Sequence, residues 1–285
     1  MKALVTGANG QLGRCLQQTA PAGVEVIPFG SAELDIRDSA AVERALARVR
    51  PQLVLNAAAY TAVDRAESEE ALALAINAQG VANLRAAAAV QGARLIHVST
   101  DFVFDGRSGV PYAPNAPTGP TGAYGRTKLA GEQAAGADAL VVRTAWVYGP
   151  AGNNFVRTML RLMAERDEVR VVADQVGTPT YAPSLADALW RLAATNALGI
   201  HHYTDSGVAS WYDFAVAIQE EALSAGLLNR AVPVIPIATS EFPTPAIRPH
   251  YSVLDKSATF ALLGGSAPHW RVNLRRMIKE VKLHG

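Results

Sequence analysis

Cysteine is almost absent from this chain of 285 residues, in which Cys15 is the only one. A lone cysteine excludes an internal disulfide framework and a metal site built from several cysteines, and we expect no metal site. Net charge is nearly absent too, at +1, so no global field favours nucleic acid or a membrane surface as a partner. No apolar run reaches the ~18 residues of a membrane span, and a strand-like start leaves no room for a signal peptide. We therefore expect a cytoplasmic protein.

What the chain does contain is ordinary globular material, with 49% apolar and 18% charged residues, enough for a large core. In the first half, short apolar runs alternate with helical patterns. Strands are expected at 3–6, 24–29, 53–56, 95–99 and 139–143, and helices at 11–20, 39–49, 67–91 and 124–135. Such alternation predicts an α/β fold of the Rossmann type, a doubly wound parallel sheet with helices on both faces.

The pattern changes after residue 150. Helices are expected at 154–166, 184–195 and 211–225, separated by short apolar runs at 169–173, 200–203 and 232–237. A loop at 242–249 that contains three prolines precedes the last helices. We expect residues 1–150 to form an NAD(P)-binding Rossmann domain. Residues 151–285 are expected to form mainly a smaller substrate-binding lobe, with some segments completing the sheet.

A glycine-rich turn stands at the start of the chain. Gly7, Gly10 and Gly13 follow an apolar strand and open a helix, which is the context of a dinucleotide-binding turn. Gly7 allows the tight turn, Gly10 lets the backbone approach a pyrophosphate, and Gly13 permits close packing of helix on strand. The helix N-terminus would face the negative charge. The spacing is G-x-x-G-x-x-G rather than G-x-G-x-x-G, and a structural turn is the alternative.

The choice between NADH and NADPH depends on the end of the second strand. An acidic residue about 20 residues after the turn binds the ribose of NADH, but this chain has Phe29, Gly30 and Ser31 there. Without that carboxylate a 2′-phosphate is not repelled, and Arg14 could pair with it. We expect NADPH as the cofactor, with NADH tolerated. A solvated surface role for Arg14 is the open alternative.

Three residues suggest the chemistry. Tyr124 and Lys128 stand four apart at the start of a predicted helix, so their side chains share one face. A tyrosine with a pKa near ~10 is a weak acid at neutral pH, and we expect the ammonium of Lys128 to lower it. Thr100 ends a strand at the sheet edge where α/β folds bind ligands, and its hydroxyl can hydrogen-bond a reacting carbonyl. Ser99 is the alternative hydroxyl. This set predicts a carbonyl reductase.

These residues together resemble the extended short-chain dehydrogenase/reductase superfamily and, within it, the family of dTDP-4-dehydrorhamnose reductases. The similarity spans essentially the whole chain. It rests on residues 7–13, 56–64, 99–106, 124–132, 143–149, 152–155, 174–180 and 243–249. The resemblance implies NAD(P)H-dependent reduction of the 4-keto group of dTDP-4-dehydro-6-deoxy-L-mannose, with a dTDP-sugar as substrate and a homodimer allowed. Members that pair subunits through a metal carry an acidic residue where this chain has Cys15, so we expect no metal-bridged dimer.

The resemblance also assigns residues. Thr100, Tyr124 and Lys128 would form the catalytic triad. Together with the glycines and Arg14, the expected cofactor contacts are Gln11, Leu12, Asp35, Ile36, Ala59, Tyr60, Thr61, Thr100, Tyr124 and Lys128. The expected substrate contacts are Asp101, Trp146 and Arg248. For Trp146 the alternative is an aromatic packed in the core, and for Arg248, which could pair with a substrate phosphate, it is an ordinary surface arginine.

Other functions stay open at this stage. Sugar-nucleotide 4,6-dehydratases follow the triad threonine with an Asp-Glu pair, whereas Thr100 is followed by Asp101 and Phe102, which disfavours dehydration. A related epimerase or a reductase of another keto-sugar nucleotide is possible on sequence alone. A binding module that resembles the regulatory subunit of methionine adenosyltransferase is the alternative from another class. His97 is expected to be a satisfied core residue, and Asn56 and Asn77 to bind backbone groups.

Overall fold

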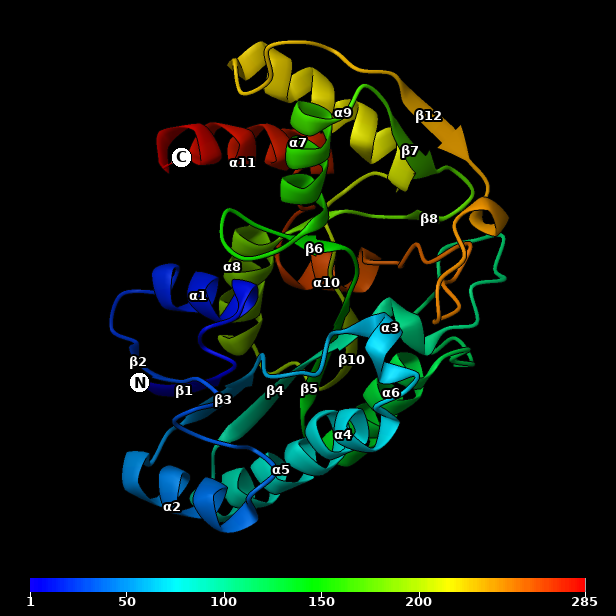
Figure 1. Ribbon diagram of the computed structural model, residues 1–285. Helices are drawn as coiled ribbons and strands as arrows, with labels where there is room; N and C mark the ends of the chain where they lie inside the picture. Colours follow the sequence, from blue (N-terminus) through cyan, green and yellow to red (C-terminus); the bar gives the residue numbers. More distant parts are fainter. Residues whose placement is uncertain (285) are drawn as a thin grey trace.

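A computed structural model describes residues 1–284, and its centre is a sheet of six parallel strands (Figure 1). The strand order is β10-β5-β4-β3-β1-β2. The strands are β1 (Lys2–Thr6), β2 (Glu25–Phe29), β3 (Leu53–Asn56), β4 (Arg94–Thr100), β5 (Leu140–Thr144) and β10 (Gly199–His202). The prediction of a doubly wound parallel sheet is confirmed. The chain leaves β1 towards β2 on one side and later fills β3 on the other, so the crevice between β1 and β3 is the expected ligand site.

Successive residues of each strand point to opposite faces and feed two cores. Ala3 and Val5 pack with α1 (Gln11–Gln18) and α8 (Ala182–Ala193) on one face. Leu4, between them, packs on the other face with α2 (Ser39–Val49) and α5 (Gly80–Gln91). Helix α6 (Ala123–Ala135) lies on that second face, against α5 and β4. The short α10 (Ser257–Leu262) contacts β10.

The helix expected at 67–91 is wrong in its start and its continuity. The structure has α3 (Val63–Ala66), α4 (Glu70–Leu74), a π-helical turn over Ala75–Gln79, and then α5. Within that turn, Asn77 accepts a hydrogen bond from the Tyr60 backbone N–H at 2.8 Å and donates to the Tyr60 carbonyl at 3.2 Å. Tertiary hydrogen bonds to a loop therefore override the alanine-rich helical pattern, and such π-turns recur beside functional sites.

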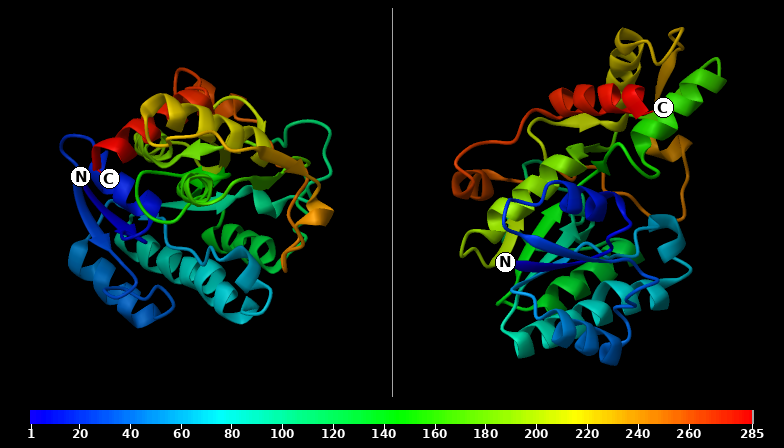
Figure 2. Two further views of the ribbon diagram at one scale, coloured as in Figure 1. Left: turned by 45° about the horizontal axis from the view of Figure 1, so that its top comes forward. Right: turned by 90° about the vertical axis from the view of Figure 1, so that its left-hand side faces the viewer.

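The second half of the chain adds a separate hydrophobic core. It is formed by α7 (Phe155–Glu165), α9 (Trp211–Ala225), α11 (Trp270–His284) and the parallel pair β7 (Val169–Val172) and β12 (Val234–Ile237). Figure 2 shows these helices at one end of the molecule and the sheet at the other. Two short ladders connect them, one of β6 (Val147–Tyr148) with β9 (Thr180–Tyr181), the other of β8 (Val176–Gly177) with β11 (Ala209–Ser210). A domain boundary at residue 150 stays a prediction.

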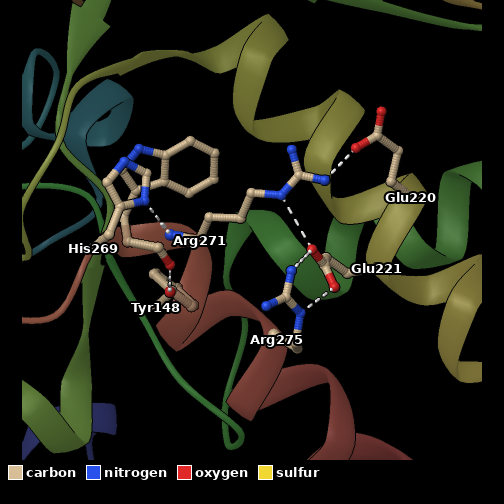
Figure 3. Close-up of polar contacts among 7 residues, drawn as sticks. Tyr148, Glu220, Glu221, His269, Arg271 and Arg275 are labelled. Carbon is tan, nitrogen blue, oxygen red and sulfur yellow. Dashed lines mark hydrogen bonds and ion pairs between the residues drawn. The ribbon is translucent and has the colours of Figure 1, made fainter.

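An ion cluster fixes α11 against α9 (Figure 3). Both guanidinium groups of Arg271 and Arg275 reach the buried carboxylate of Glu221, at 3.1 Å and 2.7 Å, and Arg271 also pairs with Glu220. These hydrogen bonds lower the pKa of Glu221. Within residues 1–284, none of the helices has the combination of length and apolar character needed to cross a bilayer.

Candidate active site

A pocket of about 930 Å³ lies at the carboxyl edge of the sheet, around the crevice between β1 and β3. Most of the residues expected from the sequence line it. They are Gly7, Gly10, Gln11, Leu12, Gly13, Asp35, Ile36, Ala59, Tyr60, Thr61, Thr100, Asp101, Tyr124, Lys128 and Trp146. Arg14 and Arg248 are not among the lining residues. The parallel topology explains the gathering, because it brings the ends of all six strands to one edge.

The glycine turn is shaped for a close backbone approach. Gly7 has a φ of +67°, and a Cβ there would lie 2.6 Å from the backbone of Ala57, while a Cβ on Gly13 would lie 2.2 Å from the Gly7 carbonyl oxygen. Only glycine fits either position. Helix α1 begins after Gly10 with no side-chain cap, so its first N–H groups are left for a ligand. Such a terminus suits an anion.

The edge of the pocket near the end of β2 carries the expected Asp35 and, beside it, a cation that was not expected from the sequence. Asp35 and Arg37 line it and form a two-pronged ion pair, with a shortest N–O distance of 2.6 Å. The hydrogen bonds from Arg37 lower the pKa of Asp35. The guanidinium of Arg14 instead donates to the Asn9 carbonyl at 3.0 Å on the exposed surface. Of these two arginines, Arg37 rather than Arg14 thus lies on the pocket wall.

Thr100 and Tyr124 meet where β4 ends and α6 begins. The Thr100 hydroxyl accepts the Phe102 backbone N–H at 3.2 Å and donates to Asp101 Oδ1 at 3.0 Å. The Phe102 ring packs edge-on to Tyr124, with centroids 5.4 Å apart. Gly125 allows this approach, because a Cβ there would lie 2.2 Å from the Phe102 carbonyl oxygen. The hydroxyl and the phenol are therefore held in fixed positions.

The expected lowering of the Tyr124 pKa is wrong. Burial raises the pKa of Tyr124 to about 12, a hydrogen bond with Thr100 opposes the rise, and the charge of Asp101 adds to it. The ammonium of Lys128 is directed elsewhere: its Nζ donates to the Val98 carbonyl at 2.6 Å and lies 3.4 Å from His97 Nε2. Burial lowers the pKa of Lys128 to about 8, opposed by the charge of Glu132. Tyr124 therefore holds its proton at neutral pH.

Two polar atoms on the pocket wall have no partner. Within residues 1–284, Asp101 Oδ2 and Thr144 Oγ1 are among the few buried side-chain atoms without a hydrogen bond, although both residues are over 90% buried. Thr144 lies beside Thr100 in the β4–β5 register. Burial raises the pKa of Asp101 to about 6, and the largest influence against this rise comes from Ser252. Ser252 lies near the carboxylate but makes no hydrogen bond of normal geometry to Oδ2. Buried unpaired polar atoms at a pocket indicate a ligand-binding surface.

Trp146 fits both interpretations made from the sequence, a ligand contact and a packed aromatic. Its ring stacks on Trp211 with centroids 3.6 Å apart, and it also lines the pocket. Its φ of +49° is one of two positive values at non-glycine residues within 1–284, and such strain gathers at functional sites. A Cβ on Gly177 would lie 2.7 Å from the indole, so the lobe is shaped around this ring.

Arg248 lies outside the pocket and joins the two halves of the molecule. Its guanidinium pairs with Asp64 on α3 at 2.8 Å, which lowers the pKa of that carboxyl. Asp64 also accepts the Ala246 backbone N–H. The sequence placed Arg248 near a substrate phosphate, and that role stays a prediction.

Some pocket residues were not expected from the sequence. Thr144, Arg37 and Val98 line the pocket but follow no spacing that marks them in the sequence. Thr144 had one available signal, since it ends the strand after Thr100 and must lie at the same sheet edge. Among residues 1–281, whose side chains the structure describes, no group of three or more histidine, cysteine, aspartate or glutamate side chains is arranged to hold a metal.

Comparison with known proteins gives consistent matches. The sequence profile of the RmlD substrate binding domain matches residues 1–283. A dTDP-4-dehydrorhamnose reductase from Burkholderia thailandensis is 41% identical over 295 aligned residues, covering 99% of each chain. The solved structure of a dTDP-4-dehydrorhamnose reductase from Clostridium acetobutylicum superposes with a TM-score of 0.93 at 44% identity, covering 99% of this chain and 100% of that one. The reductase from Bacillus anthracis, in complex with NADP, gives 0.92 at 39% identity and 98% and 99% coverage.

Proposed function

Since the chain belongs to the RmlD substrate binding domain family, we propose that it reduces the 4-keto group of dTDP-4-dehydro-6-deoxy-L-mannose with NADPH, giving dTDP-L-rhamnose. It is an oxidoreductase whose relatives bear the name of this reaction along their full length. The observation that carries the proposal is the meeting of Thr100, Tyr124 and Lys128 with the glycine turn on one pocket wall.

The residues fit the cofactor. The open N-terminus of α1 and the positions of Gly7 and Gly13, where no Cβ can be placed, suit a pyrophosphate. Asp35, Ile36 and the segment Ala59–Thr61 line the wall beyond the turn and would hold the adenosine part. Arg37 on that wall, which Asp35 orients through their ion pair, and Arg14 nearby would donate hydrogen bonds to a 2′-phosphate. When bound, NADPH supplies the hydride that reduces the carbonyl carbon.

The protein's own groups manage the carbonyl oxygen. Thr100, whose hydroxyl donates to Asp101 Oδ1 in the structure, would turn that donor to the carbonyl oxygen as negative charge develops there. Tyr124, which keeps its proton at neutral pH because burial raises its pKa, then donates that proton to form the alcohol. This leaves a phenolate on Tyr124, and Lys128, which lines the same pocket one turn further along α6, would return a proton to it from its ammonium and recover one from solvent. Asp101 and Thr144, each with an unpaired buried oxygen, would bind hydroxyl groups of the sugar, and Trp146 would cover it.

The test is turnover by the purified chain without a partner. We expect loss of NADPH absorbance with the named substrate, faster than with NADH, and a ~10²–10⁴-fold slower reaction in Tyr124→Phe. A Tyr124→Phe variant as fast as the wild type would contradict the mechanism. Absence of turnover in a folded, NADPH-binding wild type would favour a binding module instead.

A homodimer and a cytoplasmic location belong to the same proposal. Both rest on the resemblance to the reductase family alone. Analytical ultracentrifugation of the chain, with and without a divalent cation, checks the assembly. Cell fractionation checks the location.

A further inference from the structure

A row of buried polar side chains runs behind the pocket, across three neighbouring strands, and ends at Lys128. Thr6 on β1 donates to Asn56 Oδ1 on β3 at 2.6 Å. Asn56 Nδ2 lies 3.0 Å from His97 Nδ1 on β4, and His97 Nε2 lies 3.4 Å from Lys128 Nζ on α6. All four residues are at most 2% exposed. The row therefore links the strand of the glycine turn to the lysine of the proposed triad without contact with solvent.

The direction of the hydrogen bonds in this row is fixed at one end. The backbone N–H of Ala58 donates to Asn56 Oδ1 at 3.2 Å, and a backbone N–H can only donate. The amide oxygen of Asn56 thus faces Ala58 and Thr6, and its NH₂ faces His97. His97 Nδ1 must then accept, which leaves the single proton of a neutral imidazole on Nε2. Burial, with a further contribution from the charge of Lys128, keeps the pKa of His97 well below its usual range, so the ring is neutral.

This tautomer directs an N–H group at the nitrogen of Lys128. An ammonium has three donors and no acceptor, whereas a neutral amine has a lone pair that can accept the His97 proton. The Val98 carbonyl takes one N–H of Lys128 in either form. A donor facing the ammonium is unfavourable, and the same donor facing the amine is a hydrogen bond.

We propose that His97 is a positioning residue for Lys128: held by Asn56 with its proton on Nε2, it stabilises the neutral amine relative to the ammonium. Its role in turnover rests on the proposed function. A lysine whose proton is exchangeable near neutral pH can give up and regain a proton during each cycle, whereas an ordinary lysine stays charged. His97 thereby tunes the group that serves the phenol of Tyr124, without touching substrate or cofactor.

The other charged groups around Lys128 either favour its ammonium form or are paired with an opposite charge. Glu132, one turn further along α6, favours the ammonium, but its carboxylate is engaged by Arg143. From the 3-10 turn after β4, Asp101 faces the same pocket wall. The outward Arg126 of α6 pairs with Glu70 of α4. From β4, His97 contacts Lys128, and its N–H favours the neutral amine, whereas the carboxylates favour the ammonium.

Nuclear magnetic resonance tests the proposal on the whole protein without any ligand. Only five lysines occur in the chain, so the ¹³Cε signal of Lys128 is identified by comparison with Lys128→Arg. We expect Lys128 to titrate near pH 8, and the ¹⁵N shifts of His97 to show the Nε2-protonated form. A proton on Nδ1 of His97 would overturn the proposal.

Two variants separate the effect of the tautomer from that of packing. In His97→Phe the opposing N–H is lost, and we expect the pKa of Lys128 to rise by about 1. Asn56→Asp, which keeps the size and the acceptor for Ala58, would draw the His97 proton to Nδ1 and raise the pKa further. The double variant carries both His97→Phe and Asn56→Asp, so it has no imidazole whose proton could move. There Asn56→Asp should raise the pKa of Lys128 only through its added negative charge. An equal effect of Asn56→Asp in both backgrounds, or no rise in His97→Phe, would refute the coupling.

His201→Phe is the matched control, because His201 is a partly buried histidine of the same sheet, on β10, with no contact to Lys128. It should leave the Lys128 signal unchanged, and a shift equal to that of His97→Phe would contradict the proposal. If His97→Phe does not fold, Asn56→Asp and the His97 tautomer decide the question. Where turnover is measured, its loss at high pH should move upward with the Lys128 pKa. If the wild type proves inactive, the titrations still stand, so the two proposals fail separately.

Discussion

Helix α6 carries buried charge in both halves, and the two halves are built in opposite ways. In the second half, Glu132 accepts from two of the three guanidinium nitrogens of Arg143, at 2.8 Å and 2.7 Å, and from the Ser99 hydroxyl at 2.6 Å. In the first half, Tyr124 and Lys128 face the pocket with no carboxylate partner. The paired half is satisfied within the protein. The other half has polar groups whose partners must come from a ligand.

The difference shows in the direction of the pKa shifts. Burial moves the pKa of Tyr124 to about 12, that of Lys128 to about 8 and that of Asp101 to about 6, in each case towards the neutral form. The ion pair of Glu132 and Arg143 is equally buried, and its hydrogen bonds are formed within the protein. Perturbed groups without partners are typical of functional sites, and satisfied ones of structural networks.

The largest expected effect is on the paired half. Glu132→Ala leaves the Arg143 guanidinium buried without its counter-ion, and we expect a loss of about 3–5 kcal/mol in unfolding free energy. Urea denaturation measures it. A loss below about 1 kcal/mol would mean that the network does not hold the helix.

Lys128→Met, in contrast to Glu132→Ala, should raise the free energy of unfolding. The folded pKa of about 8 lies below the ordinary 10.5, so the unfolded chain binds more protons between these values. The buried lysine therefore destabilises the fold fully below pH 8, and less as pH rises towards 10.5. Its removal should stabilise the protein by up to about 3 kcal/mol at pH 7, while reductase activity falls. A Lys128→Met variant less stable than the wild type would contradict the contrast drawn between the two halves of α6.

Asp101→Asn should change stability slightly less than Lys128→Met, and with the reverse dependence on pH. The folded pKa of about 6 lies above the ordinary 3.8, so ionisation opposes folding. Stability of the wild type should fall as pH rises from 4 through 6, by up to about 3 kcal/mol. The variant lacks this fall. Thermal melting of both proteins from pH 4 to pH 8 makes the comparison, and parallel curves would contradict it.

Arg126→Ala tests an exposed pair on the outer face of the same helix. Arg126 and Glu70 lie 2.9 Å apart but are about half exposed, so solvent screens their attraction. We expect a loss under about 1 kcal/mol and unchanged activity. A loss as large as that of Glu132→Ala would show that burial is not what separates the two pairs.

Much of the fold follows from the sequence because its signals are local. The glycine turn, the apolar strand runs and the Tyr124–Lys128 spacing each lie within a short segment. Parallel topology then brings the strand ends, and with them Thr100 and Thr144, to one edge. The strands and most helices accordingly match prediction, and so does the gathering of the expected residues around one pocket, although their roles stay predictions.

What the sequence could not supply depends on burial and on contacts across the sheet. The pKa of Tyr124 was expected to fall because Lys128 lies one turn away, but burial outweighs that charge and the ammonium turns to Val98. The role of His97 depends on Asn56, 41 residues away. No spacing in the chain encodes either result.

The π-helical turn over Ala75–Gln79 has a consequence for how this chain can change in length. It holds one residue more than an α-helical turn would, so deleting one residue there would let the helix run on without a break. That shortening would improve the local backbone and yet rotate Asn77 away from the Tyr60 peptide that it clamps. The count of residues in this segment is therefore set by the neighbouring loop, and an apparently harmless deletion would be felt at the pocket wall.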